Sequence, residues 1–170
     1  MLSADDVVHA LYETDAVQTA LKLRWGDRVF QQSSPGSIDR RAVAEIVFNS
    51  SDQRHWLEGL LWPLTAQRVG AFRGALAERD PRPRAGVVET PLLFESRSDG
   101  RFDVTIAVLA DDKLRAQRLS LRDQAQLEER DRLQLSQTDK AARATYTVTN
   151  DGTIEDLERQ LAAILDSLAV

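Results

Sequence analysis

Cysteine is absent from this 170-residue chain, and histidine occurs only at His9 and His55. The first absence excludes disulfide bonds, thiolate catalysis and cysteine-ligated metal sites. The second argues against a histidine-rich metal centre, because the two histidines lie far apart in sequence. A chain without disulfides fits a reducing compartment, so we expect a cytoplasmic protein.

The chain also lacks a net positive charge, long apolar runs and glycine-rich phosphate motifs. Asp and Glu outnumber Lys and Arg by 27 to 22, which gives a net charge of -5 and a pI near 5.1. No overall positive field therefore attracts nucleic-acid phosphates, and no apolar run approaches the length of a membrane span. We expect neither a nucleic-acid nor a membrane partner. Neither GxxxxGK[ST] nor GxGxxG occurs, so these residues show no phosphate-binding loop of either kind.

The composition that remains is typical of a globular domain with a sizeable core, being 42% apolar and 29% charged. The first half is predicted to be helical. Ser3 is a candidate cap for a helix over 3–13, because Asp5 and Asp6 occupy the first turn, where the helix dipole favours acids. Apolar residues at helical spacing predict three more helices, over 15–25, 37–51 and 51–80. Pro63 either starts a new helix within the last of these or kinks it.

The second half alternates strands and helices. Strands are predicted in the runs 85–90, 102–112 and 144–153, and the first two residues look like the end of another strand. The first two runs are nearly continuously apolar, which is typical of buried strands in a parallel sheet. Two charged helices are expected over about 112–135, and Thr153 is expected to cap a closing helix. Strands separated by helices predict an α/β fold with a parallel sheet.

Two acids lie at or just after the ends of predicted strands. Glu89 ends the strand in "VVETPLLFES", with Pro91 after it, and ligands of open α/β sheets bind beyond the carboxyl ends of strands. An ordinary strand exit with an exposed acid is the favoured alternative for Glu89. Asp5 is either a general base or a helix-start acid, and the residues leave these two interpretations even. His9 is predicted to face solvent or an edge.

Arginines and one turn are the remaining candidates. Arg115, Arg118 and Arg122 share one helix face and could clamp a polyphosphate, although a solvated charged face is the ordinary interpretation. The segment "TNDGT", with Asn150 and Gly152, could pack against a flat ligand, but a simple turn is favoured.

In this order and at these spacings, the segments resemble the dephospho-coenzyme A kinase family. The resemblance spans nearly the whole chain, and these stretches carry it: "ADDVVHALYE", "WGDRVF", "SIDRRAVAEIVF", "WLEGLLWPL", "VVETPLLFES", "FDVTIAVLAD", "RDRLQ", "DKAARATYTVTNDGT" and the terminal helix. The proline-leucine-leucine segment after one strand and the asparagine-glycine turn after another are fairly specific in combination.

The resemblance implies a P-loop kinase-like fold in three parts. These are a parallel-sheet core (1–25, 85–111 and 144–170), a helical substrate-binding insertion (26–84) and a lid (112–143). It implies transfer of the ATP γ-phosphate to the ribose 3′-hydroxyl of dephospho-coenzyme A, with Mg²⁺ arriving with ATP and no cofactor bound tightly. The implied catalytic residues are Asp5, as proton acceptor, and Arg130. The implied substrate-binding residues are Arg40, Trp62, Pro63, Glu89, Pro91, Leu92 and Leu93, and the nucleotide-binding residues are Arg118, Arg122, Asn150 and Gly152.

The chain departs from the family pattern in three ways. The family opens with a strand, a Gly-rich loop carrying Lys and Ser/Thr, and a helix, so by resemblance we expect about thirty such residues before Met1. Without that loop we expect the chain as given to be inactive, and the alternative is a non-catalytic remnant that at most binds coenzyme A-like ligands. Ser3 replaces the first acid of the usual Asp-Ala-Asp, and Trp62 stands where the family has His before Pro63. The oligomeric state stays open.

Overall fold

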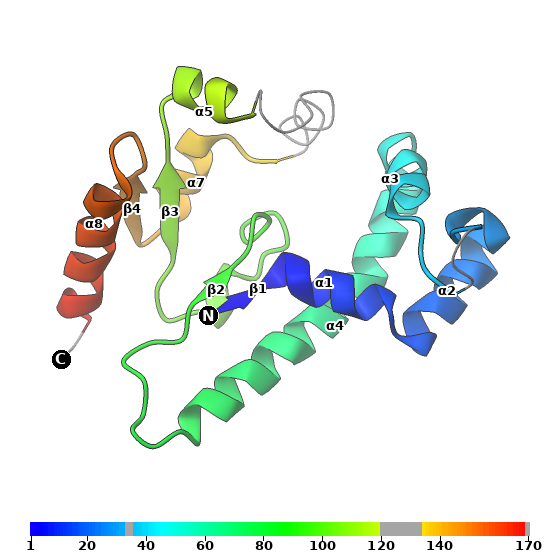
Figure 1. Ribbon diagram of the computed structural model, residues 1–170, viewed down its shortest axis with the longest axis horizontal. Helices are drawn as coiled ribbons and strands as arrows, with labels where there is room; N and C mark the ends of the chain where they lie inside the picture. The colour runs from blue at the N-terminus through cyan, green and yellow to red at the C-terminus, as the bar shows by residue number, and fades with distance from the viewer. Residues whose placement is uncertain (33–35, 120–133, 169–170) are drawn as a thin grey trace. The chain divides into compact units, whose positions relative to one another are not determined.

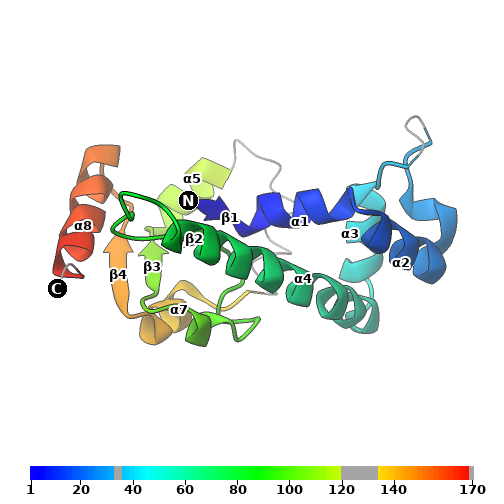
Figure 2. The ribbon, with the colours of Figure 1, turned by 90° about the horizontal axis from the view of Figure 1, so that it is seen from below.

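The computed structural model describes residues 1–32, 36–119 and 134–168. The chain divides into two compact units, Met1–Thr90 and Pro91–Val170, which are described separately (Figures 1 and 2). Within the described residues, no helix is both long and apolar enough to cross a membrane.

The first unit is mainly helical. Its elements are β1 (Leu2–Ser3), α1 (Ala4–Tyr12), α2 (Asp15–Trp25), the 3₁₀ helix η1 (Gly26–Val29), α3 (Arg40–Phe48), α4 (Ser51–Ala77) and β2 (Val88–Glu89). The predicted cap of α1 is confirmed, since the Ser3 hydroxyl accepts a hydrogen bond from the Asp6 N–H. Gly26 ends α2 with a φ of 71°, a conformation that glycine adopts without a Cβ penalty.

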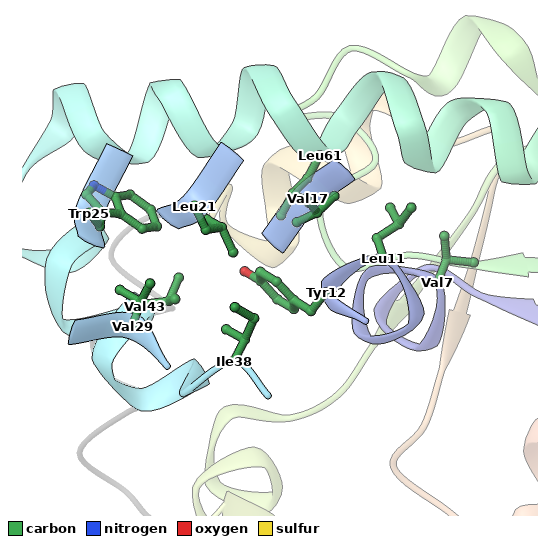
Figure 3. Close-up of a cluster of buried hydrophobic side chains, with 10 residues drawn as sticks. All are labelled: Val7, Leu11, Tyr12, Val17, Leu21, Trp25, Val29, Ile38, Val43 and Leu61. Carbon is green, nitrogen blue, oxygen red and sulfur yellow. The ribbon is translucent and has the colours of Figure 1, made fainter. Parts of the chain in front are cut away.

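One apolar cluster holds the helices of this unit together, and Figure 3 shows its side chains converging from α1, α2, α3 and α4. Leu21, Val17 and Val29 are its most deeply buried members. At one end of the cluster, the Trp25 and Trp56 rings pack edge to face with their centroids 5.0 Å apart. The Trp25 Nε1–H donates to Gln53 Oε1 at 2.9 Å. The indole is therefore buried without losing its hydrogen bond.

The helix α4 runs through Pro63 as one element, which rules out the start of a new helix, one of the two alternatives considered for this proline. Proline lacks the N–H that would donate to the carbonyl four residues back. Pro63 is exposed on α4, where water can reach the carbonyl that loses its partner. The helices α1 and α3 pack against α4, and Figures 1 and 2 show α1 alongside it.

The second unit contains η2 (Asp99–Arg101), β3 (Ile106–Leu109), α5 (Asp112–Leu119), α7 (Gln137–Arg143), β4 (Tyr146–Thr149) and α8 (Ile154–Ser167). The parallel pair of β3 and β4 starts with Thr105 and Thr145, each of which donates its backbone N–H to the other's hydroxyl. Thr153 caps α8 as predicted, in a capping box with Asp156.

The predicted parallel pairing of strands is confirmed, because β1 pairs with β2 and β3 pairs with β4, both in parallel. Two other predictions need correction. Strands buried on both faces are wrong for β3, because Ala107 is buried while Val108 is 54% exposed. Adjacent residues of a strand point to opposite faces, so an apolar run alone does not show that both faces are covered.

The second correction concerns the segment after α5. The helix α7 was not predicted, because its seven residues form no apolar stripe. Its start is fixed instead by Ser136, whose hydroxyl accepts from the Asp139 N–H at 3.1 Å and donates to the Asp139 carboxylate at 2.7 Å. The second predicted charged helix lies almost wholly in residues 120–133, outside the described part of the chain.

Candidate functional site

In the first unit, the carboxyl ends of β1 and β2 bring three polar residues together. The register pairs Ser3 with Glu89, and the Ser3 hydroxyl donates to Glu89 Oε2 at 3.2 Å. The same hydroxyl accepts from the Asp6 N–H, so the strand pair and the start of α1 are fixed by one side chain. Asp5 lies in the exposed first turn of α1, directly beyond β1. The prediction that a strand ends at Glu89 is confirmed, and Asp5 lies two residues after the end of β1.

A cleft of about 400 Å³ opens on the same unit, and we call it the His9–Arg40 cleft. Its walls come from α1, from the start of α3 and from the chain before α3. Arg40 lies at the start of α3, and its Nη1 contacts Nε2 of His9. Because a guanidinium can only donate, His9 Nε2 acts as the acceptor. The residues that line the cleft are His9, Ala10, Tyr12, Glu13, Gln31, Ser37, Ile38 and Arg40.

Tyr12 forms part of the apolar wall of this cleft and is also a member of the buried cluster. Burial raises the pKa of Tyr12 to about 12, and the nearby positive charge of Arg40 opposes the rise. Burial is the larger effect because an ionised phenolate loses most of its hydration in an apolar setting. The phenol therefore stays neutral at physiological pH.

The other predicted substrate-binding residues of this unit lie on α4. Trp62 is half-buried and Pro63 is exposed, and neither lines the His9–Arg40 cleft. The structure thus brings Arg40 together with His9 and leaves Trp62 and Pro63 outside that group.

In the second unit, the predicted Pro91, Leu92 and Leu93 form a compact turn. The Leu92 carbonyl accepts from the Ser96 N–H, and the Leu93 carbonyl accepts from the Ser98 N–H. Lys140 on α7 holds this turn, because its Nζ donates to the Pro91 carbonyl at 2.8 Å and lies 3.3 Å from Glu95 Oε1.

The side chains of Glu95 and Lys140 are mostly buried, at 14% and 22% exposed, and they form an ion pair. Backbone groups of neighbouring segments also hydrogen-bond to this pair. The Leu135 N–H donates to Glu95 Oε1 at 2.9 Å, and Lys140 also donates to Gln134 Oε1. Glu95 Oε2 is buried and accepts no hydrogen bond in the described residues. This cluster ties the Pro91–Leu93 turn to the chain that leads into α7.

The predicted nucleotide-binding residues Arg118 and Asn150 do meet. Arg118 Nη1 donates to the Asn150 carbonyl at 2.7 Å, which links α5 to the end of β4. Next to them, the Asp111 N–H donates to Asp151 Oδ1, while the Asp111 carboxylate caps α5 by accepting from the Lys113 and Leu114 N–H groups. A basic side chain and a polar turn therefore lie together where two parallel strands end.

Gly152 has a structural reason for being glycine. A Cβ at this position would come within 2.5 Å of Asp156 Oδ2, which accepts from the Thr153 N–H in the capping box. A glycine here keeps the Asn150–Thr153 turn close to the start of α8. The structure supports the turn interpretation of this segment, and contact with a ligand stays a prediction.

Two predicted arginines lie in a part of the chain whose structure is not described, and two residues of the Glu95–Lys140 ion pair were not predicted. Arg122 and Arg130 lie outside the described residues. Neither Glu95 nor Lys140 was named as a site residue from the sequence. His9 was predicted to face solvent or an edge, and it is exposed, but its contact with Arg40 was not predicted. The spacing of four between Asp5 and His9 could have indicated a shared helix face. Among the described side chains, no group of three or more His, Cys, Asp or Glu lies close enough to hold a metal ion.

Comparisons with known proteins give a consistent answer. A family model described as Dephospho-CoA kinase matches residues 1–156. A Dephospho-CoA kinase of Thermus thermophilus is 37% identical over 138 residues, which cover 78% of this chain and 64% of that protein. The Dephospho-CoA kinase of Fusobacterium nucleatum is 26% identical over 168 residues, covering 97% of this chain and 83% of that protein. The matched region thus spans under two thirds of the Thermus relative.

Solved structures agree with the sequence matches. The crystal structure of TT1252 from Thermus thermophilus has a TM-score of 0.71 at 31% identity, covering 99% of this chain and 84% of that chain. A Dephospho-CoA kinase from Campylobacter jejuni has a TM-score of 0.63 with the same coverages, and at 19% identity it supports the fold alone. The family model covers far more than half of the chain, and this chain belongs to the dephospho-CoA kinase family.

Proposed function

We propose that this chain carries the acceptor-binding and nucleotide-binding parts of a cytoplasmic kinase that transfers the ATP γ-phosphate to the ribose 3′-hydroxyl of dephospho-CoA. Membership of the family supports the reaction class. The observation that carries the assignment to residues is the position of Asp5, an exposed acid directly beyond the carboxyl end of β1. This is the edge at which open α/β folds bind ligands.

Asp5 is proposed as the general base. Its carboxylate forms no hydrogen bond or ion pair in the described residues, so it is available to accept the proton of a substrate hydroxyl. A base must come within hydrogen-bond reach of the proton it removes, and an exposed first turn allows that approach. The deprotonated ribose oxygen would then attack the γ-phosphorus, while the leaving group is ADP.

The other predicted residues are proposed as ligands of the two substrates, and the support differs from residue to residue. Arg118 and Asn150 are proposed for the nucleotide, supported by their contact at the end of β4. For the acceptor substrate, Glu89 is proposed because it ends β2, and Pro91, Leu92 and Leu93 because they come next along the chain. Arg40, Trp62 and Pro63 are proposed because they match the family pattern. Gly152, Arg122 and Arg130 stay proposals from the family pattern. Mg²⁺ is expected to arrive with ATP, which holds the ion through its own phosphates.

The division into core (1–25, 85–111, 144–170), insertion (26–84) and lid (112–143) likewise stays a proposal. The helices α3 and α4 lie in the proposed insertion, and α5 and α7 lie in the proposed lid.

We further propose that the 170-residue chain by itself binds dephospho-CoA without phosphorylating it. The support is the absence of GxxxxGK[ST] from these residues, because that loop supplies the lysine and hydroxyl that hold the β- and γ-phosphates. The same absence favours the second candidate function, a non-catalytic protein that binds coenzyme A-like ligands.

Two measurements on the purified chain test these proposals. Isothermal titration calorimetry with dephospho-CoA is expected to show binding, and mass spectrometry after incubation with Mg²⁺ and ATP is expected to show no coenzyme A. If coenzyme A forms, the chain is active alone, and D5N should then abolish its formation while D6N, in the same helix turn, should not. If no heat accompanies dephospho-CoA, the proposed function is refuted.

A further inference from the structure

The His9–Arg40 cleft contains a positive charge that the first unit itself does not neutralise. Within the described residues, the Arg40 guanidinium contacts His9 Nε2 and forms no ion pair with a carboxylate. A guanidinium carries five N–H donors, so most of them remain available. The unused donors fit an anionic group with several acceptor oxygens, such as a phosphate, which an arginine binds through paired hydrogen bonds.

The His9–Arg40 cleft also lies at a defined distance along α1 from Asp5, the proposed base. His9 follows Asp5 by four residues on α1, so the two side chains share a helix face and lie about 6 Å apart along the axis. The 3′-hydroxyl and the 5′-phosphate of a nucleotide are carried by one ribose ring and are separated by a comparable distance. A ribose whose 3′-hydroxyl reaches Asp5 can therefore place its 5′-phosphates beside His9 and Arg40.

The rest of the lining sets the direction of the ligand. Glu13, the C-cap of α1, follows His9 by four residues, so the end of the cleft away from Asp5 is acidic and suits a neutral group that donates hydrogen bonds. Gln31 and Ser37 add polar groups, and Tyr12 and Ile38 add apolar surface. A volume of about 400 Å³ is within the range of small-molecule sites.

We propose that the His9–Arg40 cleft binds the diphosphate of the acceptor substrate, a nucleoside 5′-diphosphate ester with a free 3′-hydroxyl, with Arg40 as the principal phosphate ligand. The proposal rests on the proposed function, because it takes Asp5 as the base that faces the hydroxyl. It adds which part of the substrate Arg40 contacts and makes His9 a neighbour of the phosphates.

Calorimetry on matched variants tests the role of Arg40. R40Q is expected to weaken dephospho-CoA binding by about tenfold or more, the loss of a charge-assisted hydrogen bond, and R40K by less. R41Q is the control, since Arg41 follows Arg40 on α3, is exposed, and does not line the cleft, yet its substitution changes the net charge equally. The affinity of the natural chain should fall as salt rises, and R40Q should reduce that dependence. Unchanged melting temperatures would show that the variants remain folded.

Proton NMR locates the ligand independently of affinity. The chain has two histidines, and His55 lies exposed on α4, so the H55Q variant assigns both ring signals. Dephospho-CoA is expected to shift the His9 signal and not that of His55. Binding that leaves the His9 signal in place, with equal affinities for R40Q and R41Q, would overturn the proposal while the proposed function stands. No binding at all would refute the proposed function and this proposal with it.

Discussion

Replacing Lys140 with methionine should destabilise the second unit, because this one ammonium group has three partners. It donates to the Pro91 carbonyl at 2.8 Å and to Gln134 Oε1 at 2.9 Å, and it pairs with Glu95 at 3.3 Å. Methionine keeps most of the aliphatic stem and removes every donor. The Glu95 carboxylate is left with the Leu135 N–H at Oε1 and, within the described residues, with nothing at Oε2.

The size of the effect follows from burial. Removing one partner of a fully buried ion pair costs about 3–5 kcal/mol, and a hydrogen bond to a charged group contributes about 1.5–3 kcal/mol. Because the two side chains are 22% and 14% exposed, some solvation remains, and we expect K140M to lower the free energy of unfolding by about 2–4 kcal/mol. Adding E95Q removes the uncompensated charge, so the double variant should regain about 1 kcal/mol or more.

The assay is urea unfolding at neutral pH followed by circular dichroism, with hydrogen exchange of peptides from 91–98 and 134–143 to localise the change. K22M is the matched control, since it breaks a 3.0 Å pair with Asp27 whose side chains are 63% and 82% exposed. Such exposed pairs contribute about 0–1 kcal/mol. A K140M effect no larger than that of K22M, or a double variant less stable than K140M, would refute the reasoning.

Three further outcomes are expected. The L21A substitution in the first unit should cost about 3–5 kcal/mol, seen as a lower urea midpoint by tryptophan fluorescence, since Leu21 is fully buried. Because the pKa of Tyr12 is raised in the folded state, its contribution to the free energy of unfolding is complete below about pH 10. Above that pH the phenol of the unfolded chain ionises first, so the free energy of unfolding falls by about 3 kcal/mol as the pH rises through 12. The Y12F substitution should remove this fall when the free energy of unfolding is measured as a function of pH. G152A should displace the Asp156 carboxylate and cost about 1–2 kcal/mol in thermal unfolding, so an unchanged melting temperature would contradict the turn argument.

The features that were predictable from sequence are those set by near neighbours along the chain. Thr153 caps α8 through a residue only three positions away, and the end of α2 needs only the φ of 71° that Gly26 adopts. The Ser136–Asp139 pair is a signal of the same kind, and it could have indicated α7 despite the lack of an apolar stripe. Helix starts are therefore recoverable when the capping residues are considered apart from hydrophobic periodicity.

Features set by distant residues were not predictable. The pairing of β3 with β4 joins segments 40 residues apart, and glutamine side chains complete the strand ends. Gln137 bonds both the N–H and the carbonyl of Ala110, and Gln160 does the same for Thr149. These amides satisfy backbone groups at the strand ends. No local pattern marks a polar side chain for such a role, and the same holds for Lys140.

Ser3 shows how a departure from the family pattern can be consistent with its surroundings. An acid at this position would put two carboxylates side by side at the end of the β1–β2 pair, and neither ionised group could donate a hydrogen bond. The serine hydroxyl can donate to Glu89 while it accepts from the Asp6 N–H, so it joins the strand end and the helix start without adding charge. The two residues are 86 positions apart, so the sequence showed the substitution but not the partner that accommodates it. Among the described residues, Asp5 remains a carboxylate beyond β1 that forms no ion pair, which leaves it accessible for the proton-acceptor role proposed above.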